Sequence, residues 1–177
     1  AGLAVWNANF SAGLLGRLGQ ALLKWERFRL GSDVPSRILP KLTFQDWARK
    51  VPDARTDFDW LSRDTAEVDK YVADPLCGWD ASVSMWQDVF DFIFAGANDA
   101  NFSAIRRDLP VFLLGGKKDP ATDGGKAVAD LGKRKAAMGF SAVTSTILPD
   151  TRHESLNEIN REETTARFID WAGQVTA

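Results

Sequence analysis

Val111-Phe-Leu-Leu-Gly-Gly-Lys-Lys-Asp119-Pro120 is the stretch that decides the fold of this 177-residue chain. Its apolar run, Val111–Gly115, has the length and composition of a strand buried on both faces, and the glycines end it in a turn. Such strands are typical of parallel sheets that carry helices on both sides. Asp119 therefore follows the carboxyl end of a strand, where open parallel sheets present functional groups.

Two further runs of apolar and β-branched residues predict strands at Leu3–Trp6 and Val143–Leu148. Helical periodicity occupies Gly125–Met138 and Arg161–Val175. Within the first of these helices, the basic run Lys133-Arg-Lys135 is expected to form a solvated face. The order strand, helix, strand, helix predicts parallel pairing with helical crossovers, and hence an α/β fold.

Residues 14–106 carry helical periodicity and no convincing strand, which predicts a helical layer. Its best helix is Ser82–Ala97, whose polar stripe is so narrow that we expect it to be covered on more than one side. Five of the seven tryptophans lie in this layer: Trp25, Trp47, Trp60, Trp79 and Trp86. The aromatic residues of this layer either fill the core between its helices or, in the case of Trp86 and Phe90, line a pocket for an acyl chain.

Composition argues against several classes of function. The chain has 22 Lys and Arg against 24 Asp and Glu, so it lacks the basic surface that nucleic acid requires. A single cysteine, Cys77, and a single histidine, His153, offer too few ligands for zinc, and we expect no metal and no cofactor. No apolar run is long enough for stable membrane insertion, and the first residues do not resemble a signal peptide, so we expect a cytoplasmic location.

The residues with the clearest chemical potential are Asp119 and His153. The strand Val143–Leu148 runs into Pro149-Asp-Thr-Arg-His153, so His153 is expected to lie on a loop beside that of Asp119. An Asp that accepts a hydrogen bond from one imidazole nitrogen leaves the other free to take a proton from a nucleophile. Taken alone, however, a histidine in a polar loop is more often an ordinary surface residue, and Asp-Pro is usually just a turn.

Three longer stretches resemble the bacterial α/β-hydrolases of the monoacylglycerol lipase and lysophospholipase-like group. They are Gly115–Lys126 and Leu148–Arg161, which resemble the end of those enzymes, and Asp59–Trp79, which is similar to their cap segment. The resemblance implies that Asp119 is the acid of a catalytic triad and that His153 is its base. It also implies three parts: a core strand at 1–13, a helical cap or lid at 14–106, and a C-terminal core at 107–177.

The nucleophile of such a triad is expected in Gly-x-Ser-x-Gly, on a tight turn between a strand and a helix. The chain has no such pentapeptide; the nearest is Asn9-Phe10-Ser11-Ala12-Gly13, in which Asn9 replaces the first glycine. Three strands would also make a narrow sheet with exposed edges. We therefore expect the chain to begin just after the serine-bearing segment, with the serine in a missing N-terminal half or on a separate partner chain.

These features predict the C-terminal part of an α/β-hydrolase, with a parallel sheet, flanking helices and a helical cap. The expected function is that of a serine hydrolase acting on small apolar acyl esters, similar to lipases and lysophospholipases. Two alternatives remain open. One is a non-catalytic binding protein that keeps the fold and has lost the serine; the other is a dehalogenase or epoxide hydrolase with an Asp nucleophile.

Overall fold

A computed structural model describes residues 1–11 and 13–176 of the chain. Its parallel sheet has the strand order β1-β2-β3, formed by β1 (Leu3–Trp6), β2 (Val111–Gly116) and β3 (Val143–Leu148). The helices are α1 (Leu14–Leu30), α2 (Leu39–Leu42), α3 (Phe44–Arg49), α4 (Thr65–Ala73), α5 (Val83–Ala97), α6 (Lys126–Ala137) and α7 (Arg161–Thr176), with 3-10 turns η1 (Asp99–Phe102) and η2 (Pro120–Thr122). The three predicted strands and their parallel pairing are confirmed, and β2 extends one residue further than predicted.

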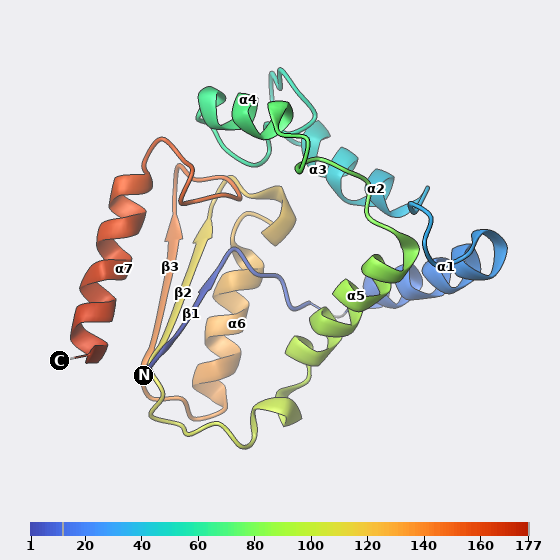
Figure 1. Ribbon diagram of the computed structural model, residues 1–177. Coiled ribbons are helices and arrows are strands. Elements are labelled where there is room, and N and C mark those ends of the chain that lie inside the picture. The colour runs from blue at the N-terminus through green and yellow to red at the C-terminus, as the bar shows by residue number, and fades with distance from the viewer. Residues whose placement is uncertain (12, 177) are drawn as a thin grey trace.

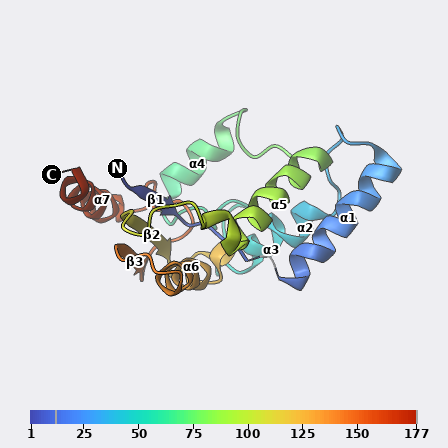
Figure 2. The same cartoon turned by 90° about the horizontal axis from the view of Figure 1, so that it is seen from below.

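Helices cover both faces of the sheet, as Figures 1 and 2 show for α6 and α7. Because successive side chains of a strand point to opposite faces, β2 supplies both layers of the core. Val111 and Leu113 pack with α6, whereas Phe112 and Leu114 pack with α7. The central strand is therefore buried throughout, which explains why its sequence is a continuous apolar run.

The predicted helical layer is present. Between residues 13 and 110, the described backbone forms α1 to α5 and η1, with an isolated bridge from Pro35 to Ser82 as its only β pairing. Figures 1 and 2 show α1 lying alongside α5, and Figure 1 shows α3 and α4 beyond the carboxyl ends of the strands. Leu23 of α1, Leu39 of α2 and Trp86 of α5 share one buried cluster that joins these helices.

The cover of α5 agrees only in part with the expectation of contacts on more than one side. Within the described chain, α5 packs on α1, and its buried Trp86 also packs on Leu39 of α2 and on Phe44. Phe92, however, is 74% exposed, and Met85 is also exposed. The expectation is therefore confirmed for the side of α5 that carries Trp86 and wrong for Phe92 and Met85.

The basic run of α6 is not the fully solvated face that its sequence predicts. Lys133 is exposed, but Lys135 is buried with its ammonium over the ring of Phe102. Arg134 donates to the carbonyl oxygen of Ala97, at 2.9 Å, and thereby satisfies the end of α5. The prediction failed because α5 and η1, more than thirty residues earlier in the chain, lie against this side of α6.

Candidate active site

Polar residues follow all three strands at the same edge of the sheet. Asn7 comes directly after β1, Asp119 lies in the loop after β2, and His153 lies in the loop after β3. Parallel strands end at a common edge, so these loops meet there. The predicted approach of Asp119 and His153 is confirmed.

Asp119 is fully buried and is held by several donors. Its Oδ1 accepts from the backbone N–H of Ala121 at 2.9 Å, and its Oδ2 accepts from the hydroxyl of Thr122 at 2.8 Å. The same Oδ2 lies 3.0 Å from Nδ1 of His153. An ionised carboxylate only accepts hydrogen bonds, so the arrangement favours the imidazole tautomer with its proton on Nδ1. Nε2 is then the basic nitrogen, and the side chain of His153 is 29% exposed.

Gly116, the last residue of β2, lets the loop after β3, which carries His153 and is called the histidine loop below, lie close to the sheet. A Cβ atom at this position would collide with the carbonyl oxygens of Thr151 and Arg152. Only glycine permits this approach, because it has no side chain. The glycine turn therefore has two effects: it places Asp119 after the strand, and it allows the loop with His153 to pack against the strand.

Asn7, which follows β1 on the other side of β2, also contacts the histidine loop. Its side-chain amide donates to the carbonyl oxygen of His153 and, at 3.2 Å, to the hydroxyl of Ser155. The backbone of Asn7 has a φ of 45°, a left-handed conformation that Asn tolerates better than most residues. Sequence reasoning missed Asn7, although its place directly after a predicted parallel strand was a usable signal.

The segment before α4 packs directly on the histidine loop. The backbone N–H of His153 donates to the carbonyl oxygen of Trp60 at 3.4 Å, and that of Glu154 donates to Leu61 at 2.7 Å. The indole of Trp60 also contacts the imidazole, with ring centroids 5.1 Å apart. The stretch that resembles a cap segment therefore forms one wall around His153.

Two charged residues of the histidine loop secure this contact. Arg152 donates to the carbonyl oxygens of Asp59 at 2.6 Å and Ser62 at 2.9 Å. Burial lowers the pKa of the Arg152 guanidinium below its ordinary value. Glu158 is fully buried, and its carboxylate accepts from the side chain of Arg63 at 3.1 Å and from the backbone N–H of Arg152 at 2.9 Å. Neither Glu158 nor Arg63 was assigned a role from sequence.

An apolar cavity of about 390 Å³ lies on the other side of this wall. Aromatic and other apolar side chains make up much of its lining, including Phe44, Phe58, Trp60, Trp79 and Met85. Since Trp60 touches both the cavity and the ring of His153, the cavity and the candidate catalytic group share one side chain. The cavity has the size of a small-molecule site.

The sequence-predicted substrate residues lie elsewhere. Trp86 is buried in the cluster that joins α1, α2 and α5, and Phe90 packs on Gly19 of α1. Neither residue lines the cavity beside Trp60, which instead receives Met85 from α5. A role for Trp86 and Phe90 in substrate binding stays a prediction.

The candidate nucleophile pentapeptide lies beyond β1. Ser11 is exposed, and its backbone N–H donates to the side chain of Asn9 at 3.0 Å. Ala12 of this pentapeptide is outside the described residues. No serine hydroxyl within 1–11 or 13–176 forms a hydrogen bond with the ring of His153.

The described residues contain no group of three His, Cys, Asp or Glu side chains that could hold a metal ion. None of their helices combines the length and the apolar character needed to cross a lipid bilayer.

Comparison with known proteins adds to this geometry. The family described as serine aminopeptidase, S33, matches residues 11–160. A highly thermostable carboxyl esterase from Bacillus coagulans, solved with glycerol, superposes with a TM-score of 0.85 at 15% identity, over 99% of this chain and 57% of that one. A lipase in its open form superposes with a TM-score of 0.79 at 23% identity, over 98% and 57% of the two chains. Comparison with curated proteins finds no significant match.

This chain therefore spans 57% of the length of each of the two solved structures. At such low identities, the likeness concerns the fold. The parallel sheet with flanking helices that was predicted from sequence is confirmed by this likeness as well as by the coordinates.

Proposed function

The chain belongs to the serine aminopeptidase S33 family of α/β-hydrolases, and from this premise we propose that it carries the acid and the base of a serine hydrolase that cleaves apolar carboxylic esters. The contact between Asp119 and His153 carries this proposal, because a buried carboxylate 3.0 Å from an imidazole nitrogen is the arrangement that catalysis by such a triad needs.

The two residues have distinct roles in this mechanism. Nε2 of His153 takes the proton from a serine hydroxyl as its oxygen attacks the ester carbonyl, and then gives that proton to the departing alcohol. Water then attacks the acyl-serine. His153 takes a proton from this water molecule and returns it to the serine oxygen as the carboxylic acid is released. Asp119 keeps the imidazole in the required tautomer and stabilises its protonated form in each step.

The serine in this mechanism belongs to sequence outside residues 1–177. It is supplied by an upstream segment of the same protein or by a separate chain. Support comes from the surroundings of His153, since no described serine hydroxyl forms a hydrogen bond with its ring. The absence of Gly-x-Ser-x-Gly from the chain supports the same assignment.

The apolar substrate is inferred from the cavity beside the imidazole. Phe58, Trp60 and Met85 offer surfaces that favour an acyl chain over a charged group. Trp60 separates this cavity from His153, so a bound acyl chain would end close to the group that moves the proton. The helices α1 to α5 act as the cap over this site.

Labelling the intact protein with a fluorophosphonate, followed by peptide mass spectrometry, tests this proposal. We expect one modified serine, located outside residues 1–177, and loss of labelling in His153→Ala. The Lys133→Ala variant, altered at an exposed site on α6, is the matched control and should label normally.

Other labelling patterns would distinguish the alternatives. Modification of Ser11 would place the nucleophile within this chain and overturn its proposed location. A protein that neither labels nor hydrolyses esters fits the non-catalytic alternative. Failure to label, combined with uptake of ¹⁸O from water into an Asp side chain during turnover, would instead establish an Asp nucleophile.

A further inference from the structure

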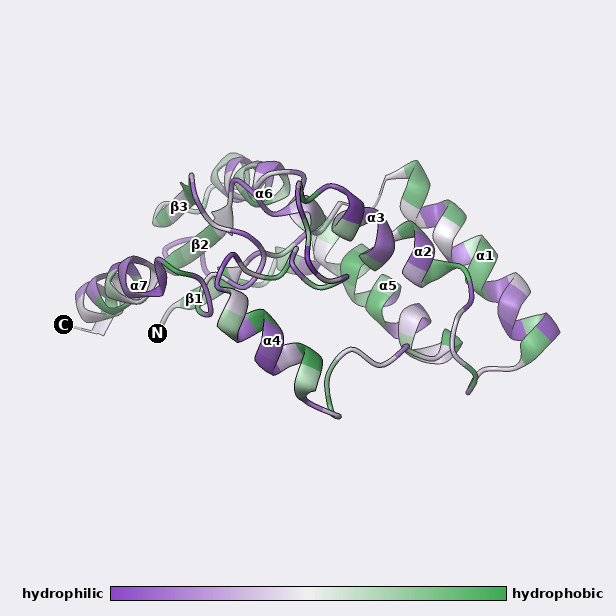
Figure 3. Cartoon of the chain, turned by 90° about the horizontal axis from the view of Figure 1, so that it is seen from above, coloured by the Kyte–Doolittle hydropathy of each residue, from purple (hydrophilic) through white to green (hydrophobic). Residues whose placement is uncertain are grey.

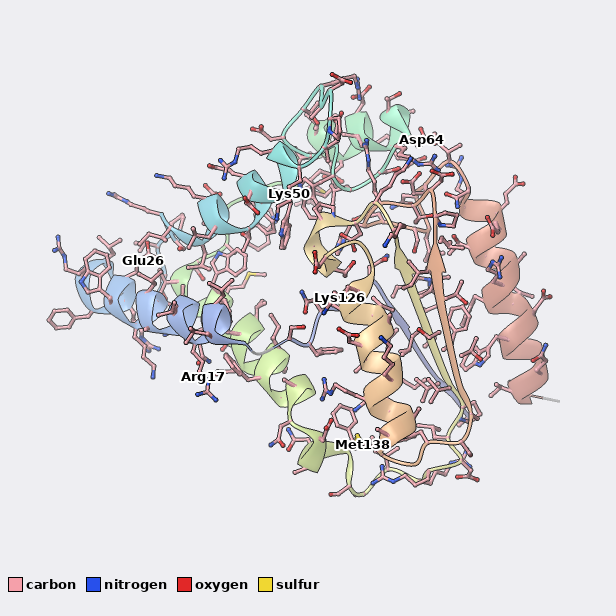
Figure 4. All side chains as sticks on the ribbon, turned by 180° about the vertical axis from the view of Figure 1, so that it is seen from behind. Arg17, Glu26, Lys50, Asp64, Lys126 and Met138 are labelled. Atoms are coloured by element: carbon pink, nitrogen blue, oxygen red, sulfur yellow. The ribbon has the colours of Figure 1, made fainter. Side chains whose placement is uncertain are left out.

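Trp60 joins the helical layer to the candidate catalytic histidine through its side chain and its backbone. It belongs to the segment between Lys50, at the end of α3, and Asp64, just before α4, both of which Figure 4 labels. Trp60 is 5% exposed, and its ring centroid lies 5.1 Å from that of the His153 imidazole. Its carbonyl oxygen accepts from the backbone N–H of His153 at 3.4 Å. Trp60 is therefore placed to influence the orientation of the imidazole.

Two aromatic rings of α3 also contact the indole of Trp60. The ring of Phe44 stacks with it, with centroids 5.9 Å apart and an angle of 10° between the planes. The ring of Trp47 meets it edge to face, with centroids 5.0 Å apart. Aromatic pairs at such distances favour defined relative orientations of their rings. The position of the indole beside His153 is therefore set largely by α3.

The aromatic cluster around Trp60 also reaches the loop of Asp119. The buried residues of this cluster are Ala48, Val51, Trp60 and Leu61. Ala121 packs against them, and its backbone N–H donates to Oδ1 of Asp119 at 2.9 Å. Figure 3, a view onto the carboxyl ends of the strands, shows α3 and α4 beside the loops that follow the strands. One apolar cluster therefore contacts the loops of both members of the candidate pair.

The indole of Trp60 also lines the apolar cavity of about 390 Å³. A ligand in a cavity supplies dispersion contacts to the side chains that line it. Nε1 of Trp60 is buried without an acceptor among the described residues, so no hydrogen bond from this nitrogen to them fixes the ring. The indole is thus held by packing, and a ligand in the cavity would add to that packing.

We propose that Trp60 is a positioning residue that couples the filling of the cavity to the orientation of His153. An acyl chain in the cavity holds the indole against the imidazole and narrows the range of orientations that Nε2 of His153 samples. Longer acyl chains then raise kcat, because a catalytic group held in the productive orientation lowers the barrier. This proposal rests on the ester hydrolysis proposed above, and it adds that selectivity for the acyl chain is expressed in the proton-transfer step.

The histidine loop keeps other contacts with this segment when the indole is removed. Arg152 donates to the carbonyl oxygens of Asp59 at 2.6 Å and Ser62 at 2.9 Å. These acceptors belong to the backbone, so a substitution of the Trp60 side chain leaves them available. A variant without the indole therefore isolates the contact between the indole and the imidazole.

Steady-state kinetics of the intact protein test the proposal, with p-nitrophenyl acetate and p-nitrophenyl octanoate as substrates. We expect a higher kcat for the octanoate in the wild type. Trp60→Leu should lower kcat about tenfold for the octanoate, an effect of the size that an aromatic pair supplies, but less than about twofold for the acetate. Trp60→Phe keeps a ring beside the imidazole and should retain the preference.

The matched control is Trp171→Leu on α7. This substitution removes a half-buried indole that packs on Phe112, on the face of the sheet covered by α7. We expect it to leave kcat unchanged for both substrates.

Proton NMR of His153 supplies a readout that does not require hydrolysis. His153 is the single histidine of residues 1–177, and the loss of its signals in His153→Gln assigns them. We expect 1-octanol, used as a probe of the cavity, to shift the ring-proton signals of His153 in the wild type and in Trp171→Leu, but not in Trp60→Leu. A merely structural role of Trp60 would not produce this difference.

The outcomes separate this proposal from the function on which it rests. A shift by 1-octanol that depends on Trp60, in a protein that hydrolyses no ester, would support the coupling and contradict ester hydrolysis. Hydrolysis that His153→Ala abolishes, with an unchanged preference for the octanoate in Trp60→Leu, would overturn the coupling alone. Unshifted His153 signals in the wild type at the solubility limit of 1-octanol would also overturn it, even if Trp60→Leu failed to fold.

Discussion

Arg63 and Glu158 form an ion pair between the helical layer and the histidine loop, with Nε of Arg63 3.1 Å from Oε2 of Glu158. The carboxylate is fully buried and also accepts from the backbone N–H groups of Arg63, Arg152 and Ile159. The pair therefore fixes the wall that carries Trp60 against the loop that carries His153.

Removing the guanidinium of Arg63 tests how much its ion pair with Glu158 contributes to the free energy of unfolding. In Arg63→Met, Glu158 keeps its backbone donors but loses its counter-charge, so we expect a loss of about 3 kcal/mol in the free energy of unfolding, near the low end for a broken buried pair. Urea denaturation of the intact protein measures it. The control is Arg167→Met, which breaks the exposed pair with Glu163 and should cost about 0.5 kcal/mol or less. Equal losses in the two variants would contradict a structural role for the buried pair.

Gly116→Ala tests the close approach of the histidine loop to β2. The added methyl group would meet the backbone of Thr151 and Arg152, which cannot yield as a flexible side chain can. We expect kcat for ester hydrolysis to fall by about 100-fold, because a displacement of about 1 Å at a catalytic group has an effect of this size. Gly173→Ala in α7, where a Cβ atom meets nothing within 4 Å, should leave kcat unchanged. Normal kcat in Gly116→Ala would mean that the loop tolerates the shift.

Asn7 is expected to act as a positioning residue for His153. In Asn7→Ala, the His153 carbonyl oxygen loses its side-chain donor and the left-handed backbone becomes strained, so we expect stability to fall by about 1–2 kcal/mol. A positioning role also predicts a lower kcat with little change in KM. Asn9→Ala, which removes exposed bonds to the carbonyl oxygen of Ala121 and from the backbone N–H of Ser11, is the control. A rise in KM with normal kcat would point to substrate binding instead.

The buried Lys135 predicts a pH dependence of stability. Burial, with the nearby charge of Arg134, lowers its pKa to about 8 in the folded protein, from an ordinary value of 10.5. Between these values the unfolded chain binds a proton that the folded chain has released, so stability rises with pH across this window. We expect the wild type to gain about 2 kcal/mol relative to Lys135→Met between about pH 7 and pH 10. Urea unfolding at both pH values measures the gain.

Lys133→Met serves as the control for removing a lysine from α6. Lys133 is exposed, so its loss should alter the free energy of unfolding by no more than about 0.5 kcal/mol. If the difference between the wild type and Lys135→Met were the same at both pH values, the low pKa of Lys135 would be refuted.

Much of the core could be predicted from sequence because its signals are local. β1 and β3 have the bounds that their apolar and β-branched runs predict, and Ser82 caps α5 where its sequence placed the start of the helix. The approach of Asp119 to His153 was also predictable, since loops that follow neighbouring parallel strands must meet at one edge.

The remaining features depend on contacts between distant parts of the chain. The sequence around Lys135 predicts a solvated residue, but in the structure its ammonium lies over the ring of Phe102. The cavity takes Met85 rather than Trp86 from α5, because the side of that helix with Trp86 is used in packing on α1 and α2. Glu158 and Arg63 are 95 residues apart, and no pattern in the sequence predicts that they pair.

The most direct test of the catalytic role of the Asp119–His153 pair is the kinetics of Asp119→Asn in the intact protein, with p-nitrophenyl butyrate as substrate. The Asn side chain is close in size to Asp, but its amide can favour the wrong tautomer of His153 and does not stabilise the protonated imidazole. We expect kcat to fall by about 10⁴-fold while KM changes little. Hydrolysis of the ester by the variant at the wild-type rate would mean that Asp119 does not act on His153 in catalysis.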